Sequence, residues 1–151
     1  MDILVFRLNH TSSAELAELE KSCFSDPWTV GMFRDSFNDP LTRCFGASVG
    51  GKTVGFGMMM AVAEEGEILR IAVRPELRRG GIGRALMQTM VDAAAEEGLT
   101  SMTLEVRASN IPATELYKAF GFEEIAIRKN YYEHPTEDAR IMEKKLCSYS
   151  Q

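Results

Sequence analysis

Residues 68–98 read ILRIAVRPELRRGGIGRALMQTMVDAAAEEG, and this stretch decides the fold. It opens with the short apolar run Ile68–Val73, which is typical of a strand, and Arg74-Pro75 ends that run. After the glycines, Arg84–Glu97 carries apolar residues at helical spacing, and Gly98 closes the segment. The sequence therefore predicts a strand, a glycine-rich turn and a long helix in direct succession.

Two more strands precede this unit and pair with it. Thr42–Val49 and Lys52–Ala63 look extended, and Gly50-Gly51 between them is a two-residue hairpin signal. A second turn at Glu64-Glu65-Gly66 leads into the strand that begins at Ile68. Together these segments predict an antiparallel meander of three strands.

The start of the chain predicts a strand and two helices. Ile3–Leu8 is short and apolar, and the hydroxyls of Thr11-Ser12-Ser13 can cap the helix that follows. Thr29 can cap the second helix, which Asn38-Asp39-Pro40 ends.

The end of the chain supplies three strands and one helix. Met102–Val106 alternates like a half-buried strand, and a helix follows Asn110 and closes at Gly121. Glu123–Lys129 and Arg140–Leu146 look extended, with the polar loop Tyr131–Asp138 between them. The order βααβββαβαββ predicts an α/β (α+β) fold, in which one mixed, mostly antiparallel sheet carries about four helices on both faces. We expect residues 1–151 to form a single domain.

Composition excludes several classes of protein. The net charge of −5 gives the chain no overall electrostatic footprint for nucleic acid, although Leu77–Val91 holds three arginines and no acid. Three cysteines without a CxxC pair and only two histidines exclude a structural zinc site. The most apolar run, Val54–Ala63, is ten residues long where a membrane span needs about 20. We therefore expect a cytoplasmic protein with free thiols, no metal and no membrane contact.

Arg78–Arg84 forms the first candidate site, because it lies between a strand and the start of a helix. Glycines let a ligand approach backbone N–H groups, and the helix N-terminus favours an anion such as a pyrophosphate. A P-loop is excluded because Arg84-Ala85 follows Gly83, and a dinucleotide motif is excluded by Leu86. An ordinary glycine-rich turn with solvated arginines would satisfy the same pattern.

The second candidate site runs from Leu104 to Tyr117. Glu105 alternates with the apolar Leu104 and Val106, so its carboxylate points to solvent or to a cleft. Asn110 and Tyr117 are seven residues apart, which puts them within roughly 20° on one helix face. A solvated strand glutamate and a core tyrosine are the alternative interpretations.

These motifs together resemble a known family. Ile71-Ala72-Val73, Arg78-x-x-Gly81-x-Gly83, the run LEVRASN at residues 104–110, Tyr117 and Gly121-Phe122 are similar to the GCN5-related N-acetyltransferases. The likeness is greatest to the ribosomal-protein-alanine N-acetyltransferases of the RimI type. Cys23–Trp28 and Arg128–Tyr132 extend the resemblance over nearly the whole chain.

The resemblance implies a GNAT fold with a β-bulge and splayed central strands, acetyl-CoA as the donor and a protein α-amino group as the acceptor. It implies that Glu105 is the general base and Tyr117 the general acid. The implied acetyl-CoA site comprises the backbone of Ile71, Ala72 and Val73, the turn formed by Arg78, Arg79, Gly80, Gly81, Ile82, Gly83 and Arg84, and the side chains of Asn110 and Tyr117.

The implied acceptor groove comprises Phe24, Trp28, Arg70, Tyr131 and Tyr132. Arg70 stands where the family more often has Asn, and Gly80 where it often has a longer side chain. Phe24 and Trp28 could equally serve only to pin the first helices to the sheet. We treat Cys44 and Cys147 as incidental thiols.

The implied roles agree with acid–base chemistry. An α-amine with a pKa of about 7.7–8.0 is mostly protonated at pH 7, so a carboxylate is needed to take its proton. On the strength of the resemblance, we expect an acetyl-CoA-dependent N-terminal alanine acetyltransferase that works as a monomer or weak dimer. Lysine side chains, a small amine, and a non-catalytic acyl-CoA-binding module remain the alternatives.

Overall fold

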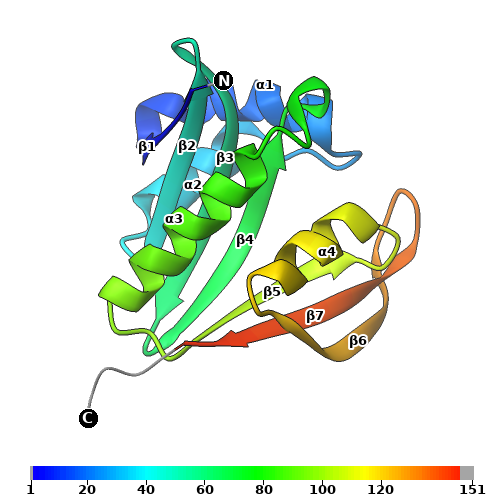
Figure 1. Ribbon diagram of the computed structural model, residues 1–151. Coiled ribbons are helices and arrows are strands. Elements are labelled where there is room, and N and C mark those ends of the chain that lie inside the picture. The colour runs from blue at the N-terminus through cyan, green and yellow to red at the C-terminus, as the bar shows by residue number, and fades with distance from the viewer. Residues whose placement is uncertain (1, 147–151) are drawn as a thin grey trace.

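The computed structural model describes residues 2–146, which form a seven-stranded sheet (Figure 1). The strands lie in the order β1-β2-β3-β4-β5-β7-β6. Their bounds are β1 Ile3–Arg7, β2 Thr42–Val49, β3 Lys52–Val62, β4 Glu65–Val73, β5 Ser101–Arg107, β6 Glu123–Tyr132 and β7 Glu137–Lys145. The helices are α1 Ser13–Cys23, α2 Val30–Asn38, α3 Ile82–Glu96 and α4 Ile111–Ala119, with short 3₁₀ turns at His10–Ser12 and Pro75–Leu77. The predicted order of strands and α-helices is confirmed.

Strands β4 and β5 form the one parallel pair of the described sheet, and they separate after a short contact. Their register runs only from Glu65–Ile68 against Ser101–Leu104. A register shift between Met58 and Met59 of β3 marks a bulge at the same level of the sheet. Figure 1 shows β4 and β5 side by side at their starts and diverging toward their ends. The expected bulge and splayed strands are therefore present.

The helices cover both faces of the sheet. Helices α1 and α2 pack on β2, β3 and β4 through a cluster that includes Leu16, Phe33 and Phe56. Helices α3 and α4 cover the other face, where Leu86 and Tyr117 join one cluster with Leu104 and Val106 of β5. Because side chains alternate along a strand, Glu105 points to the α1–α2 side, beyond the reach of that smaller cluster.

Helix α3 begins at Ile82, two residues before the predicted start at Arg84. Ile82 is buried in the core, and Gly81 precedes it as the N-cap residue with a positive φ of 89°. Only glycine adopts that conformation without strain. The buried isoleucine therefore starts the helix earlier and places Gly83 inside its first turn.

Strands β4, β6 and β7 extend beyond their predicted bounds. Strand β4 starts at Glu65, β6 continues to Tyr132, and β7 starts at Glu137. Most of the added residues are polar, and backbone pairing rather than apolar alternation makes them strands. The predicted loop Tyr131–Asp138 shrinks to residues 133–136. Cys147 and the C-terminal residues 148–151 lie outside the described residues. Among residues 2–146, no helix is long and apolar enough to cross a membrane.

Candidate active site

The separated end of β4 offers main-chain groups on the side that faces β5. The N–H of Arg74 donates to the carbonyl of Val54 on β3, at 2.8 Å. Because hydrogen-bonding directions alternate along an antiparallel strand, the main-chain groups of Ile71 and Val73 point the other way, toward β5. The β5 register has already ended at Ile68. This edge of β4 can therefore pair with an extended ligand.

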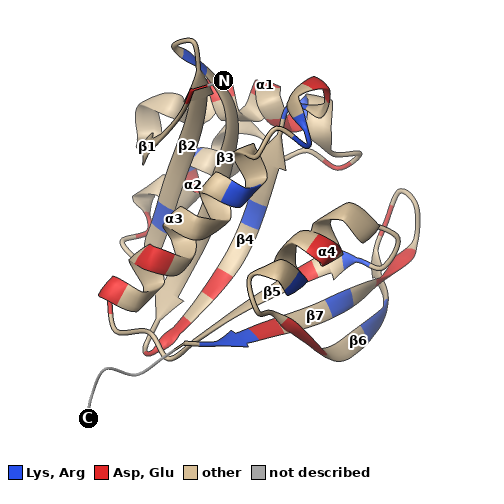
Figure 2. Cartoon of the chain, viewed as in Figure 1, with Lys and Arg blue, Asp and Glu red and all other residues tan. Residues whose placement is uncertain are grey.

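The turn before α3 has the features of an anion site. Gly81 caps the helix without a side-chain hydrogen bond, so the first N–H groups of α3 are open to a ligand. Arg79 and Gly80 are exposed, and the Arg84 guanidinium lies over the Phe120 ring at 5.8 Å. Figure 2 shows the basic segment in the first turn of α3. These backbone N–H groups and arginine side chains fit a pyrophosphate. The side chain of Ile82 is buried, so this residue can contribute only its backbone N–H.

Two further predicted residues of the acetyl-CoA site have local roles. The Arg78 Nε donates to the Val73 carbonyl at 3.2 Å, which ties the turn back to the end of β4. Asn110 is the N-cap of α4 rather than a residue of its helical face, and its Oδ1 accepts from the Ala113 N–H at 3.2 Å. The calculated offset of roughly 20° from Tyr117 is therefore wrong, because Asn110 has non-helical dihedral angles.

A pocket of about 260 Å³ lies on the α1–α2 side of the sheet, where β4 and β5 meet. It brings together five of the predicted residues from distant parts of the sequence. Its lining comprises Trp28, Glu67, Ile68, Leu69, Arg70, Glu105, Tyr131 and Tyr132. Phe24 does not line the pocket but contacts Arg70, whose guanidinium lies 4.1 Å from the Phe24 ring centroid.

Glu105 has an unsatisfied oxygen in this pocket. Its Oε2 is buried and has no hydrogen-bond partner among the described residues, and Arg128 Nη1 approaches it only to 3.8 Å. Burial, followed by the negative charge of Glu105, raises the pKa of Tyr132 to about 12. The same two causes raise the pKa of Tyr131. The Glu105 carboxylate therefore faces the uncharged hydroxyl groups of Tyr131 and Tyr132, and its Oε2 is available to accept a proton.

Tyr117 is buried in α4, with its ring 6.2 Å from that of Phe122. Burial, and to a lesser degree Tyr132, raises the pKa of the Tyr117 phenol well above its ordinary value. The hydroxyl therefore remains protonated at neutral pH. It can donate a proton but cannot serve as a resting base.

Sequence reasoning missed three residues around the pocket. Glu67 lines the pocket, and the carboxylate of Glu20 accepts hydrogen bonds from Arg70. Arg107 holds the β6–β7 loop by donating to the carbonyls of Glu133 at 2.7 Å and Pro135 at 2.9 Å. Glu20 had a usable signal, since it stands four residues after Leu16 on the apolar stripe of α1. Glu67 had none, because it looks like an ordinary solvent-facing strand residue, whereas Arg107 belongs to the run LEVRASN but was given no role of its own.

Residues 13–122 match the acetyltransferase (GNAT) family. The chain therefore belongs to this family. The acetyltransferase is 35% identical over 139 residues to the [ribosomal protein bS18]-alanine N-acetyltransferase of Escherichia coli K12, covering 88% of this chain and 92% of that protein. It is 32% identical to N-alpha-acetyltransferase RimI of Mycobacterium tuberculosis, covering 93% and 90% of the two chains.

The three-dimensional comparison agrees with the sequence comparison. The crystal structure of the ribosomal-protein-S18-alanine N-acetyltransferase from Escherichia coli matches this acetyltransferase with a TM-score of 0.91 and 30% identity. The match covers 99% of both chains. The predicted GNAT fold is confirmed, and membership of the family implies acetyl-CoA as the cosubstrate.

Proposed function

We propose that this acetyltransferase transfers the acetyl group of acetyl-CoA to the N-terminal α-amino group of a protein, most specifically the N-terminal alanine of ribosomal protein bS18. The relatives named above support this acceptor. The observation that carries the chemistry is the Glu105 carboxylate in the pocket beside the open edge of β4, because its Oε2 has no hydrogen-bond partner within residues 2–146.

The cosubstrate supplies a thioester-activated acetyl group when it is bound. Ile71 and Val73 would pair with its extended arm through their backbone, whereas the main-chain groups of Ala72 face β3, where Ala72 pairs with Phe56. Asn110, the N-cap of α4, would contact the same arm. Residues 78–84 would hold the pyrophosphate through the N–H groups at the start of α3 and through Arg78, Arg79 and Arg84.

The chain's own groups move two protons in this mechanism. Glu105 takes a proton from the acceptor ammonium, directly or through a water, and frees the lone pair that forms the new C–N bond. The N–H of Val73 stabilises negative charge on the acetyl oxygen. Tyr117 gives its proton to the sulfur as the C–S bond breaks, and the nitrogen gives up its second proton, which restores the Tyr117 phenol through water. The products are the acetylated amine, the free thiol and the one proton that Glu105 holds.

A thiol-release assay tests the proposal directly. A short peptide with a free N-terminal alanine should release CoA thiol, whereas the same peptide with a blocked N-terminus should not. Release from a blocked peptide that contains lysine would favour a side-chain acceptor. Silence on every peptide with acetyl-CoA still bound would favour a small amine or a binding module.

We further propose that residues 1–151 act as one domain, in the cytoplasm, as a monomer or weak dimer. Cys23 and Cys44 support the choice of compartment, since both are free thiols in the structure.

A further inference from the structure

Glu20 of α1 is a fully buried carboxylate with both oxygens engaged. Its Oε1 accepts from Arg70 Nη2 at 2.8 Å, and its Oε2 accepts from Arg70 Nε at 3.1 Å. Oε1 also accepts from the backbone N–H of Trp28 at 2.8 Å. A buried carboxylate needs such partners, and this one joins three segments: α1, β4 and the loop between α1 and α2.

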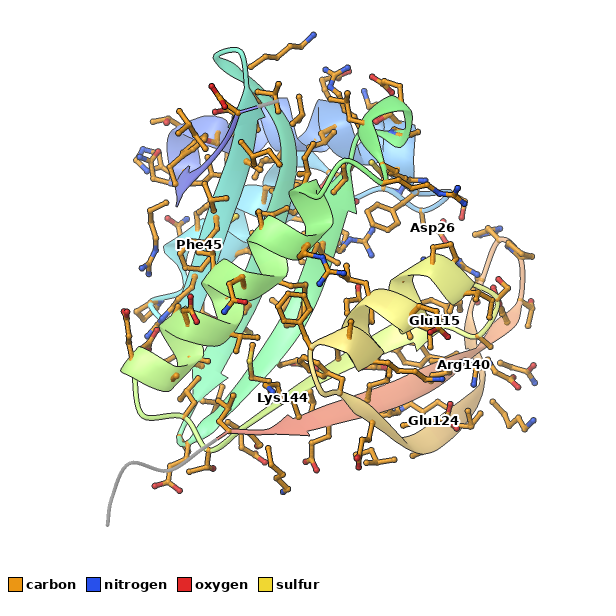
Figure 3. All side chains as sticks on the ribbon, viewed as in Figure 1. Asp26, Phe45, Glu115, Glu124, Arg140 and Lys144 are labelled. Atoms are coloured by element: carbon orange, nitrogen blue, oxygen red, sulfur yellow. The ribbon has the colours of Figure 1, made fainter. Side chains whose placement is uncertain are left out.

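Arg70 carries this connection into the loop Phe24–Trp28, which we call the aromatic loop. Its Nη2 donates to the Asp26 carbonyl at 3.1 Å, and Figure 3 labels Asp26 on this loop. Its guanidinium lies 4.1 Å from the Phe24 ring centroid and 5.3 Å from that of Trp28. Stacking on two aromatic faces and a bidentate ion pair together define one position for this side chain.

The same arginine lines the acceptor pocket. Its Nε and Nη2 donors are committed to Glu20 and Asp26, whereas no described residue accepts from its Nη1. The Nη1 donors suit a main-chain carbonyl, which an extended peptide supplies next to its α-amine. Lysine could not replace this arginine, because an ammonium lacks the planar fork that binds Glu20 at two points.

We propose that Glu20 is a positioning residue for the acceptor: it holds Arg70 and the N–H of Trp28 so that the aromatic loop forms one wall of the acceptor pocket and Arg70 Nη1 faces the acceptor's main chain. This inference rests on the proposed function for the identity of the acceptor. Glu20 itself touches no substrate, since it is fully buried. It acts only through Arg70 and the aromatic loop.

The experiment uses Trp28 as its reporter, because it is the only tryptophan in the chain. Acrylamide quenching of its fluorescence should increase at least twofold in Glu20→Gln, which keeps the size of the side chain but loses its charge. The KM for the alanine peptide should rise about tenfold, while the KM for acetyl-CoA stays within twofold of the wild-type value. Arg70→Lys should change all three quantities in the same directions.

Glu97→Gln is the matched control. Arg43 binds Glu97 with the same two-point geometry, at 3.0 Å from Nε and 2.8 Å from Nη2. Neither residue lines the acceptor pocket, so breaking this pair should change neither Trp28 quenching nor either KM.

The inference fails if Trp28 is as protected in Glu20→Gln and Arg70→Lys as in the wild-type protein, or if the two KM values rise together. If circular dichroism shows that Glu20→Gln does not fold, the quenching and KM measurements on Arg70→Lys test the inference instead. This variant changes the partly exposed residue of the ion pair and not the fully buried one. A wild-type enzyme that is silent on the peptide would refute the proposed acceptor, and the quenching comparison would still decide the role of Glu20.

Discussion

Glu105 combines an unsatisfied buried oxygen with a place in the acceptor pocket. Glu105→Gln should lower kcat about 100-fold or more at pH 7 and leave the KM for acetyl-CoA unchanged. The deficit should shrink between pH 7 and pH 9, because the acceptor amine then loses its proton without help. Steady-state kinetics over this pH range check the prediction.

The control for this variant is Glu115→Gln, which removes an exposed carboxylate from α4 (Figure 3). Its kcat should equal that of the wild type. Unfolding in urea should show that Glu105→Gln changes stability by less than about 1 kcal/mol, since no hydrogen bond of Oε2 is lost. A Glu105→Gln enzyme with wild-type kcat at pH 7 would remove this residue from the mechanism.

Tyr117 keeps its proton because burial raises the pKa of its phenol. Tyr117→Phe should lower kcat about 10- to 100-fold while the Kd for acetyl-CoA, measured by calorimetry, stays constant. Its hydroxyl forms no hydrogen bond with the described residues, so stability should change by less than about 1 kcal/mol. An unchanged kcat with weakened acetyl-CoA binding would make this residue a binding group and not an acid.

At the scale of elements, α3 has a glycine with positive φ near each end. Gly81 at the N-cap has φ 89° and Gly98 just beyond the C-terminus has φ 78°. Alanine at either position should destabilise the fold by about 1–2 kcal/mol, because a residue with a Cβ is strained at positive φ. A steric clash does not add to this cost, since the Cβ would meet no atom closer than 3.9 Å at Gly81 and none within 4 Å at Gly98. Urea unfolding measures this cost.

The two variants should differ in ligand binding. Only Gly81→Ala alters the open N–H groups at the start of α3, so only this variant should raise the KM for acetyl-CoA, by about tenfold. Gly98→Ala supplies the matched loss of stability at the far end of the same helix. An equal effect of both variants on that KM would show that the turn contributes stability and not recognition.

Local signals predicted the elements, and long-range contacts formed the site. Alternation of Leu104, Glu105 and Val106 was enough to place the glutamate on the open face, and capping at Thr29 marked the start of α2 correctly. The pairing of Glu20 with Arg70 spans fifty residues of sequence, and no local pattern encodes a partner at that distance. The starts of β4 and β7 escaped prediction for a related reason, since pairing with neighbouring strands makes their polar residues extended.

At the scale of the whole molecule, burial of a thiol and of tyrosine hydroxyls makes the free energy of unfolding depend on pH in the alkaline range. Burial raises the pKa of the Cys44 thiol from 9.0 to about 12, and that of Tyr132 from 10.0 to about 12. The Tyr117 phenol shifts in the same direction. Above pH 9 the unfolded chain loses these protons before the folded protein does, so the free energy of unfolding must fall as pH rises from about 9 to 12.

Cys44→Ala isolates one contribution to this fall. Each such group contributes a slope of up to about 1.4 kcal/mol per pH unit between its unfolded and folded pKa values. The variant should therefore lose stability less steeply than the wild type between pH 9 and pH 11, even though removing a buried sulfur lowers its stability at pH 8 by about 1 kcal/mol. Urea unfolding at pH 8, 9, 10 and 11 compares the two slopes. Parallel slopes would mean that the thiol titrates alike in both states, and the alkaline loss would then belong to the buried tyrosines.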